Sequence, residues 1–154
     1  MAVRLTAFPA TGAAMSLKSA TANIIVSDVA RTVDWYRDVL GFEFALGVIA
    51  GSQDPVFEAT GQPLGFAMLK RDDVELMFQS LDSLLDDLPG TTLGSGDGFT
   101  LYIGVDDIDA LYAEVSAKTD MAVDLRDTFY GAREFHVRDC NGLLVGFARR
   151  PAQG

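Results

Sequence analysis

Residues 130–147 read YGAREFHVRDCNGLLVGF, and this stretch decides the fold prediction. Within it the apolar Phe135 and Val137 alternate with polar residues, which is the two-residue period of a strand with one buried face. Residues 139–142 read DCNG and supply turn chemistry, because Asn-Gly tolerates positive φ. We therefore predict two strands joined by a tight turn. The same hairpin holds the only histidine and the only cysteine of the chain.

Elsewhere in the chain, the spacing of apolar residues predicts further strands and helices. An apolar face at helical spacing predicts a helix over residues 29–40, ended by Gly41. Either Ser27 or Asp28 can cap its N-terminus, and Asp106 is the expected cap of a second helix. Strands are expected at residues 22–26, 42–48, 65–70, 74–79, 100–105 and 121–125, a long loop at 50–64 and a short acidic helix at 80–88.

The order strand-helix-strand-strand-strand occurs twice in these predictions. The clearest local match is VSDV at residues 26–29 against VDDI at residues 105–108. Each half alone is too small to bury both faces of its sheet, so an internal duplication is a strong fold signal. We predict an α+β fold of two paired βαβββ modules that form a cleft. The expected organisation is an N-terminal tail at 1–19, a first module at 20–80, a linker at 81–97 and a second module at 98–150.

Composition limits the classes of partner. The 154-residue chain has a net charge of −10 and a sequence pI of about 4.3, so nucleic acid and anionic membranes are poor partners. A cationic ligand is the natural electrostatic match, although an acidic surface also serves solubility alone. A single cysteine excludes an internal disulfide and gives no reason to assume an oxidising compartment, so we expect a cytoplasmic protein. No apolar run approaches the roughly 18 residues of a membrane span.

Three segments carry a family resemblance: VSDV at residues 26–29, WYRDVLGF at 35–42, and the run from Arg133 to Gly142. In this order they resemble the vicinal oxygen chelate superfamily, over about residues 20–150. That superfamily includes glyoxalase I, extradiol dioxygenases, fosfomycin-modifying enzymes and bleomycin resistance proteins. The resemblance implies paired βαβββ modules and a homodimer. It does not by itself give a function, which must be argued from the site.

The resemblance also implies four positions for metal ligands. Metal-using members carry His, Gln or Glu on the first and last strand of each module, and those positions fall here on Thr21, Glu75, Thr100 and Gly146. Only Glu75 is a good ligand, whereas a catalytic divalent ion generally needs about three protein ligands. We therefore expect no metal cofactor, and glyoxalase or dioxygenase chemistry is disfavoured.

His136 has two interpretations that the sequence leaves open. Strand parity places Glu134 and His136 on the face away from the helices, and in fosfomycin-modifying members the residues at these two positions line the pocket. His136 would then be an acid, base or hydrogen-bonding group, or would join Glu134 and Glu75 in a non-standard metal site. The alternative is a structural strand histidine satisfied by a neighbouring carboxylate.

Glu75 and Met77 lie on the cleft side of the predicted strand 74–79, because Leu76 and Phe78 take the helix side. Glu75 could attract a cation or form a cross-strand ion pair with Lys70. On the same parity Thr21, Asn23, Thr100 and Tyr102 are expected to line the cleft.

Tyr130 resembles an aromatic residue of bleomycin resistance proteins, a ring that can stack on a flat ligand. The acidic stretch Asp82, Asp86 and Asp87 is either a solvated helix face or a rim that steers a cation. Structural roles are expected for Trp35, at the core or a dimer interface, and for Arg133, whereas Cys140 is expected to be incidental.

These expectations favour metal-independent binding, that is sequestration, of a small, cationic and partly aromatic molecule by a homodimer. The alternative is a lyase, isomerase or transferase of the superfamily, with a non-standard metal or acid/base site around Glu75, Glu134 and His136. A third alternative is a structural or regulatory module without a ligand. The residues expected to bind the ligand are Glu75, Met77, Tyr102, Tyr130, Glu134 and His136.

Overall fold

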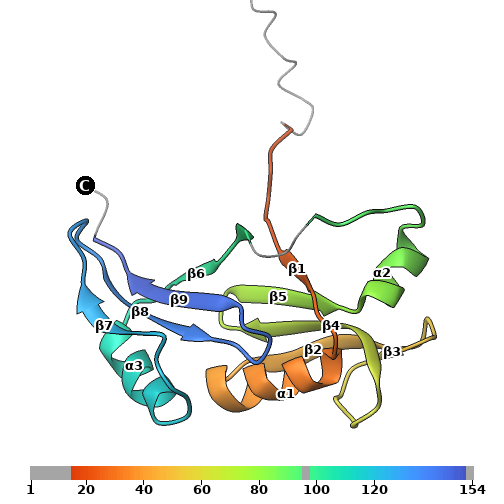
Figure 1. Ribbon diagram of the computed structural model, residues 1–154, viewed down its shortest axis with the longest axis horizontal. Coiled ribbons are helices and arrows are strands. Elements are labelled where there is room, and N and C mark those ends of the chain that lie inside the picture. The colour runs from red at the N-terminus through yellow and green to blue at the C-terminus, as the bar shows by residue number, and fades with distance from the viewer. Residues whose placement is uncertain (1–14, 95–97, 152–154) are drawn as a thin grey trace, which may run out of the picture.

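The computed structural model describes residues 15–94 and 98–151. Most of the expected N-terminal tail, residues 1–14, and part of the expected linker, residues 95–97, lie outside the described residues. The described chain has the predicted α+β architecture, with two separate sheets and three helices (Figure 1). None of these helices is long and apolar enough to cross a membrane.

The first half builds a five-stranded sheet in the order β1-β5-β4-β2-β3. Edge strand β1 runs parallel to β5, and the other neighbours are antiparallel. Strand β3 was not predicted: it lies within the expected loop 50–64 and pairs with β2 through only two residues. The elements of this half are β1 (Ala22–Ile25), α1 (Val29–Leu40), β2 (Glu43–Ile49), β3 (Pro55–Val56), β4 (Leu64–Arg71), β5 (Val74–Gln79) and α2 (Leu81–Asp87).

The second half repeats this arrangement with a four-stranded sheet in the order β6-β9-β8-β7. Its edge strand β6 again runs parallel to the last strand, β9. The predicted double occurrence of strand-helix-strand-strand-strand is therefore confirmed. The elements are β6 (Leu101–Gly104), α3 (Ile108–Ser116), β7 (Val123–Asp127), β8 (Arg133–Arg138) and β9 (Leu144–Arg149).

Capping residues set the ends of the two long helices. Asp28 is the N-cap of α1, where its carboxylate accepts a hydrogen bond from the Arg31 amide at 3.0 Å, and Gly41 ends the helix with a φ of 69°. The predicted cap of the second helix is wrong by one residue. Asp107, not Asp106, accepts from the Ala110 amide at 3.1 Å, because the cap must immediately precede the first helical residue.

The β8–β9 hairpin forms as predicted, and its turn joins the two halves. Buried Asp139 accepts hydrogen bonds from the amides of Asn141 at 2.8 Å and Leu143 at 2.9 Å within the turn. The same carboxylate accepts a 2.8 Å hydrogen bond from the hydroxyl of Tyr36 on α1. Burial and the adjacent Asp139 charge raise the pKa of Tyr36 far above its usual value, so this hydroxyl stays a donor. Gly142 takes the positive φ that the turn requires.

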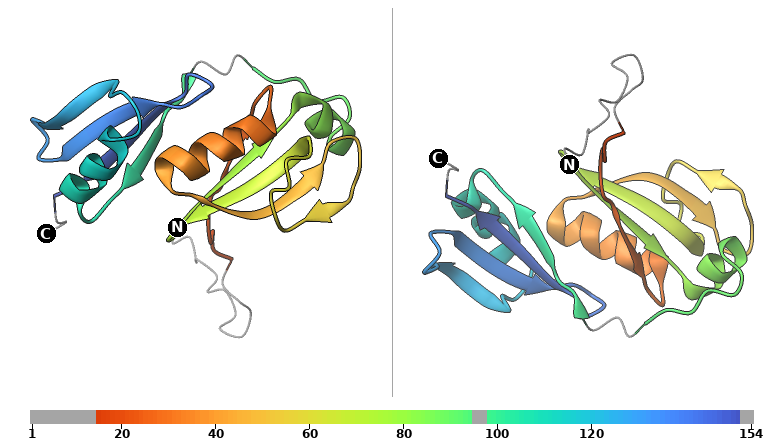
Figure 2. Two further views of the ribbon diagram at one scale, coloured as in Figure 1. Left: turned by 90° about the horizontal axis from the view of Figure 1, so that it is seen from below. Right: turned by 90° about the horizontal axis from the view of Figure 1, so that it is seen from above.

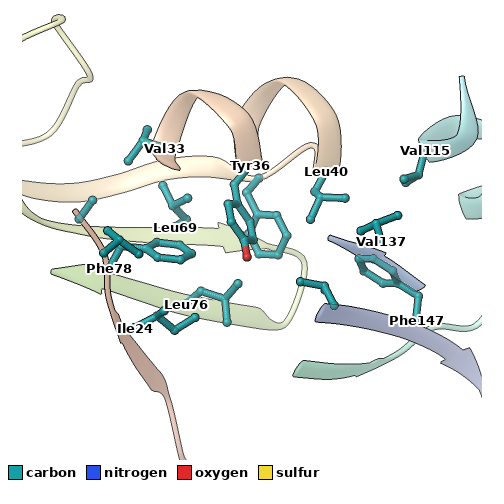
Figure 3. Close-up of a cluster of buried hydrophobic side chains, with 14 of the residues drawn as sticks. Ile24, Val33, Tyr36, Leu40, Leu69, Leu76, Phe78, Val115, Val137 and Phe147 are labelled. Carbon is teal, nitrogen blue, oxygen red and sulfur yellow. The ribbon is translucent and has the colours of Figure 1, made fainter. Parts of the chain in front are cut away.

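One hydrophobic cluster spans both halves. Figure 3 shows Tyr36 and Leu40 of α1 between the strands of the first sheet and side chains of the second half, including Val137 and Phe147. Outside this cluster, Arg71 of β4 pairs with Glu114 of α3 at 3.1 Å. The halves therefore join through their helix sides.

The opposite faces of the two sheets, which we call the open faces, are turned away from α1 and α3. Both helices lie on the same side of the strands in Figure 1, and Figure 2 shows the sheets side by side. The predicted parity is correct, since Leu76 and Phe78 are buried in the core, as are Phe135 and Val137. Function-bearing side chains are therefore sought on the open faces and at the ends of the strands.

Candidate functional site

Glu134 is the centre of a polar network on the open face of the second sheet. It is only 1% exposed. Its carboxylate accepts hydrogen bonds from the hydroxyls of Tyr102 at 2.7 Å and Tyr130 at 2.8 Å, and from the Arg126 guanidinium at 3.1 Å. Burial opposes ionisation of Glu134, but these three donors and nearby His136 outweigh it and lower the pKa below its usual value. The carboxylate is thus ionised, its hydrogen bonds are made within the protein, and it holds the side chains of Tyr102 and Tyr130 in place.

The pKa of Tyr102, one of the three donors, is shifted in the opposite direction. Burial, followed by the hydrogen bond to Glu134, raises the pKa of Tyr102 to about 12. Tyr102 is therefore a neutral donor at physiological pH, and it is not a general base. Tyr102 as a residue is 38% exposed, so part of it is held by the protein while another part faces outward.

His136 lies against the Tyr102 ring, with centroids 6.5 Å apart and the planes 26° from parallel. Its buried Nδ1 has no hydrogen-bond partner within the described chain, so the expectation of a histidine satisfied by a carboxylate is wrong at this atom. A Cβ at Gly146 would lie 2.7 Å from Nε2 of His136 and 3.1 Å from Cδ2 of Tyr102. The two rings therefore occupy the space in which a side chain on Gly146 would lie.

Glu75 and Met77 lie on the open face of the first sheet, apart from this network. The Glu75 carboxylate is 3.4 Å from Nζ of Lys70, its partner on β4, which is the cross-strand ion pair expected as one of its two interpretations. Met77 is half-buried on the same face. The six predicted ligand residues thus form two groups: Tyr102, Tyr130, Glu134 and His136 come together, whereas Glu75 and Met77 do not join them.

The residues at the implied metal positions do not fit a metal ion. In the first sheet Ala22 pairs with Leu76, which places Thr21 beside Glu75. In the second sheet Gly146 pairs with Tyr102 and not with Thr100, so the four implied positions do not form two equivalent pairs.

A shift of the alignment does not rescue the metal site. Leu101 pairs with Val145, so Thr100 is beside Leu144, which is no better a ligand than Gly146. Within residues 15–94 and 98–151, no three His, Cys, Asp or Glu side chains come together as metal ligands. The alternative centre of Glu75, Glu134 and His136 is therefore not assembled within one chain.

A large pocket lies instead between α2 and the end of the first sheet, with a volume of about 1260 Å³. Apolar side chains such as Val48, Leu64 and Phe66 contribute to its lining. Among the residues that the structure describes, its lining also has four carboxylates and neither lysine nor arginine; the carboxylates are Asp28, Asp82, Asp86 and Asp87. We call this region the acidic pocket. Asp82, Asp86 and Asp87 thus line this pocket and are also exposed to solvent, so their positions agree with a solvated helix face as well as with a rim that steers a cation.

Gln79 fixes one wall of the acidic pocket, a role that the sequence did not reveal. It is 4% exposed. Its side-chain amide donates to Asp87 at 2.8 Å and to Ser83 at 3.0 Å, both on α2, while its oxygen accepts from Asn23 of β1 at 2.9 Å. The short helix α2 is thereby tied to the first sheet, and with it the carboxylates on its surface.

A smaller groove of about 500 Å³ lies between the two halves, and we call it the inter-half groove. Its lining combines core residues such as Phe42 and Phe147 with the carboxylates of Asp72, Asp73 and Asp106. Neither this groove nor the acidic pocket is lined by any of the six predicted ligand residues.

The remaining predicted residues have structural surroundings. Trp35 packs edge-on against Tyr36, with centroids 5.2 Å apart. Arg133 forms 3.1 Å ion pairs with Asp109 and Asp127, in agreement with its expected structural role. Burial, followed by the charge of Asp139, raises the pKa of Cys140, which opposes thiolate formation.

Several residues of the site were missed because their partners are distant in sequence. Arg126 and Glu134 lie on neighbouring strands, and Arg150 covers Tyr102, which is 48 positions earlier in the chain. Asp28 was recognised as a helix cap but not as pocket lining. Only the parity of β8 could have indicated that Glu134 faces other strand residues, and parity does not identify them.

Comparison with known proteins agrees with this architecture. Residues 18–147 match the model of the family described as Glyoxalase/Bleomycin resistance protein/Dioxygenase superfamily. No curated protein matches the chain.

Among solved structures, TioX from Micromonospora sp. ML1 is 24% identical with a TM-score of 0.62, over 87% of this chain and 100% of that one. The bleomycin-binding protein from bleomycin-producing Streptomyces verticillus, solved with copper(II)-bleomycin, is 23% identical with a TM-score of 0.60, over 90% and 99%. A glyoxalase/bleomycin resistance protein/dioxygenase family enzyme from Burkholderia phytofirmans PsJN is 18% identical with a TM-score of 0.59, over 85% and 97%. These identities establish the fold alone, whereas the family match covers most of the sequence. The chain belongs to the glyoxalase/bleomycin resistance protein/dioxygenase superfamily.

Proposed function

We propose that this protein binds a small organic cation in the acidic pocket and holds it without chemical change. The observation that carries the proposal is the lining of the pocket, which combines four carboxylates with apolar side chains and, within residues 15–94 and 98–151, includes no basic residue. Carboxylates attract a cation, and the attraction strengthens as water is excluded. The apolar lining suits the carbon body of such a ligand, so an amine or amidine with an aromatic or aliphatic part is the expected class.

Two of the four carboxylates carry the expected attraction. Asp28 and Asp87 already accept hydrogen bonds, from the Arg31 amide and from Gln79. Asp82 and Asp86 are exposed, and within the described chain they have neither a basic partner nor a hydrogen-bond donor. These two charges are therefore available to a ligand, and they are the ones to neutralise in a test.

Binding without turnover is proposed because the usual chemistry of the superfamily has no suitable residues here. The implied metal positions offer one carboxylate, Glu75, which is paired with Lys70. Glu134, the other candidate acid or base, is occupied by three donors. The solved bleomycin-binding protein shares the fold and holds a small molecule, which supports a binding role for this chain.

We also propose that the protein acts as a homodimer. In the loop between β7 and β8, Phe129 is fully exposed and packs edge-on against Tyr130, with ring centroids 5.0 Å apart. An exposed aromatic surface of this kind is a contact site for another molecule. The proposed contact between two copies is centred on Phe129. Light scattering should give twice 16.5 kDa, and Phe129→Asp should shift the mass toward 16.5 kDa.

The function is tested by thermal shift with a panel of organic cations, each paired with an uncharged isostere. At least one cation is expected to stabilise the protein while its isostere does not. The Asp82→Asn/Asp86→Asn double variant should lose most of that shift, because it removes the free charges but keeps the pocket volume. Asp120→Asn, an exposed site away from the pocket, is the matched control and should behave like the wild type.

Two results would contradict this function. Equal shifts in the double variant and the wild type would show that the pocket charges do not bind the cation. Near-stoichiometric Zn²⁺, Ni²⁺, Mn²⁺ or Fe²⁺ after loading, measured by elemental mass spectrometry and lost in Glu75→Ala or His136→Ala, would replace sequestration by a metal-dependent function.

A further inference from the structure

The exposed ring of Tyr102 already carries a cation that belongs to the chain itself. Cζ of Arg150 lies over this ring, 5.2 Å from its centroid. A guanidinium within about 6 Å of an aromatic face is attracted by the quadrupole of the ring. The ion pairs of residues 15–94 and 98–151 do not include Arg150, so in this part of the chain the ring is its recognised partner.

The Tyr102 ring is held in place on several sides. Its hydroxyl donates to Glu134 at 2.7 Å, and the ring of His136 stacks against it. Gly146 leaves the space that both rings need, because a Cβ there would meet each of them at 3.1 Å or less. A ring fixed in this way loses little freedom when a flat group lies on it, which favours binding.

The C-terminal segment that brings Arg150 to the ring leaves the sheet just before it. Strand β9 ends at Arg149. Pro151 lies near the loop after β7, where its Cγ would be 3.5 Å from a Cβ at Gly131, next to Tyr130. The segment therefore contacts the ring of Tyr102 through Arg150 and passes close to Gly131, and no strand pairing holds residues 150 and 151.

We propose that the Tyr102 ring is a binding platform for planar organic cations, and that Arg150 is an internal occupant which the ligand displaces. This inference takes the class of ligand, an organic cation, from the proposed function. It adds a residue of the chain, Arg150, that competes with the ligand for the Tyr102 ring. The displaced guanidinium of Arg150 can turn toward solvent, since the ring is its partner in the described chain, and Arg126 stays paired with Glu134. A guanidinium or amidinium suits the platform best, because its flat delocalised charge can stack as Arg150 does.

Benzamidinium is the test probe, and benzamide is its uncharged isostere. Binding is followed through the Tyr102 ring resonances and the backbone amides by NMR titration. An exposed cation–π contact of the usual strength should keep Arg150 over the Tyr102 ring for most of the time. Arg150→Ala should therefore raise the affinity for benzamidinium by about three- to sixfold. Arg149→Ala removes the same charge next to it without touching the ring and should leave the affinity unchanged.

The opposite outcomes are equally specific. If Arg150→Ala leaves the affinity at Tyr102 unchanged or weakens it, Arg150 is not a competitor and the proposal is overturned. If benzamidinium shifts no Tyr102 resonance in any variant, or benzamide shifts it equally, the ring is not a cation platform. Amides of α2 are read in the same titration, so loss of the Tyr102 response with retention of the α2 response would overturn this inference and leave the proposed function standing.

Discussion

The two halves repeat one order of elements and differ in the use of their carboxylates. In the first half, the acidic pocket between α2 and the end of the sheet presents Asp82 and Asp86, and within the described chain its lining has no basic residue. In the second half, the carboxylate of Glu134 is buried and shared among three donors on the open face of the sheet. Two carboxylates of the pocket are thus without a basic partner in the described chain, while Glu134 is part of the structure.

The helix sides of the two sheets do not differ in this way. In both halves alternate strand residues enter one core, and the halves are fastened by the Tyr36–Asp139 hydrogen bond. The duplicated fold therefore depends on the helix-side residues, whereas the residues outside this core are free to diverge between the halves. Variants that affect stability should therefore cluster at the helix side and in the Glu134 network, and variants that affect binding at the acidic pocket.

The largest loss of stability is expected from Asp139→Ala, at the seam that the two halves share. The change leaves the buried Tyr36 hydroxyl and two turn amides without their acceptor, which should cost about 3 kcal/mol. Urea unfolding measures the free energy, and exposed Asp120→Ala should stay within about 0.5 kcal/mol of the wild type. A loss for Asp139→Ala as small as that of this control would mean that the Tyr36–Asp139 hydrogen bond does not hold the two halves together.

Gly146→Ala should cost about 2 kcal/mol, because its Cβ would overlap the His136 ring on the second open face. Gly104→Ala on neighbouring β6 is the matched control, since no atom lies within 4 Å of its Cβ position. In a His136→Ala background the same Gly146→Ala change should cost much less. Equal costs in both backgrounds would show that His136 does not fill this space.

Glu134→Gln should cost about 1–2 kcal/mol in the free energy of unfolding, because the amide cannot replace a charged acceptor for all three donors. Asp86→Asn, in the acidic pocket, should change stability by less than about 0.5 kcal/mol. Urea unfolding of both variants compares the buried carboxylate with a carboxylate of the acidic pocket. A stability loss at Asp86 as large as that at Glu134 would mean that the two carboxylates do not differ in structural role.

The smallest expected effect is the pH dependence of the Glu134 contribution. Its pKa is lowered in the folded protein, so its stabilising effect is present above the usual glutamate pKa and is lost as the pH falls through the lowered value. The stability difference between the wild type and Glu134→Gln should therefore shrink progressively on acidification from neutral pH. A difference that grows in acid would mean that the folded-state pKa is raised, as burial alone would make it.

The sequence predicted more of the fold than of the site for a physical reason. Alternation along one strand is local, so Phe135 and Val137 could be assigned to the core, and Gly41 and Asp28 to the ends of a helix, from neighbouring residues. The site depends on pairs that the chain brings together from afar, such as Gln79 with α2 and Arg150 with Tyr102. Nor do local patterns show whether a carboxylate lacks a basic partner in the described chain, as Asp86 of α2 does, or is bonded to several donors, as Glu134 is.

If the acidic pocket of the first half binds an organic cation, NMR chemical-shift mapping should locate the ligand there. Labelled protein is titrated with the cation that gives the largest thermal shift, and then with its uncharged isostere. We predict amide shifts at Ser80 to Asp87 and at Val48 to Gln53, the segments that line the pocket, and their loss in Asp82→Asn/Asp86→Asn. Shifts confined to the inter-half groove near Asp72 and Asp106, or equal shifts in the double variant, would contradict the claim.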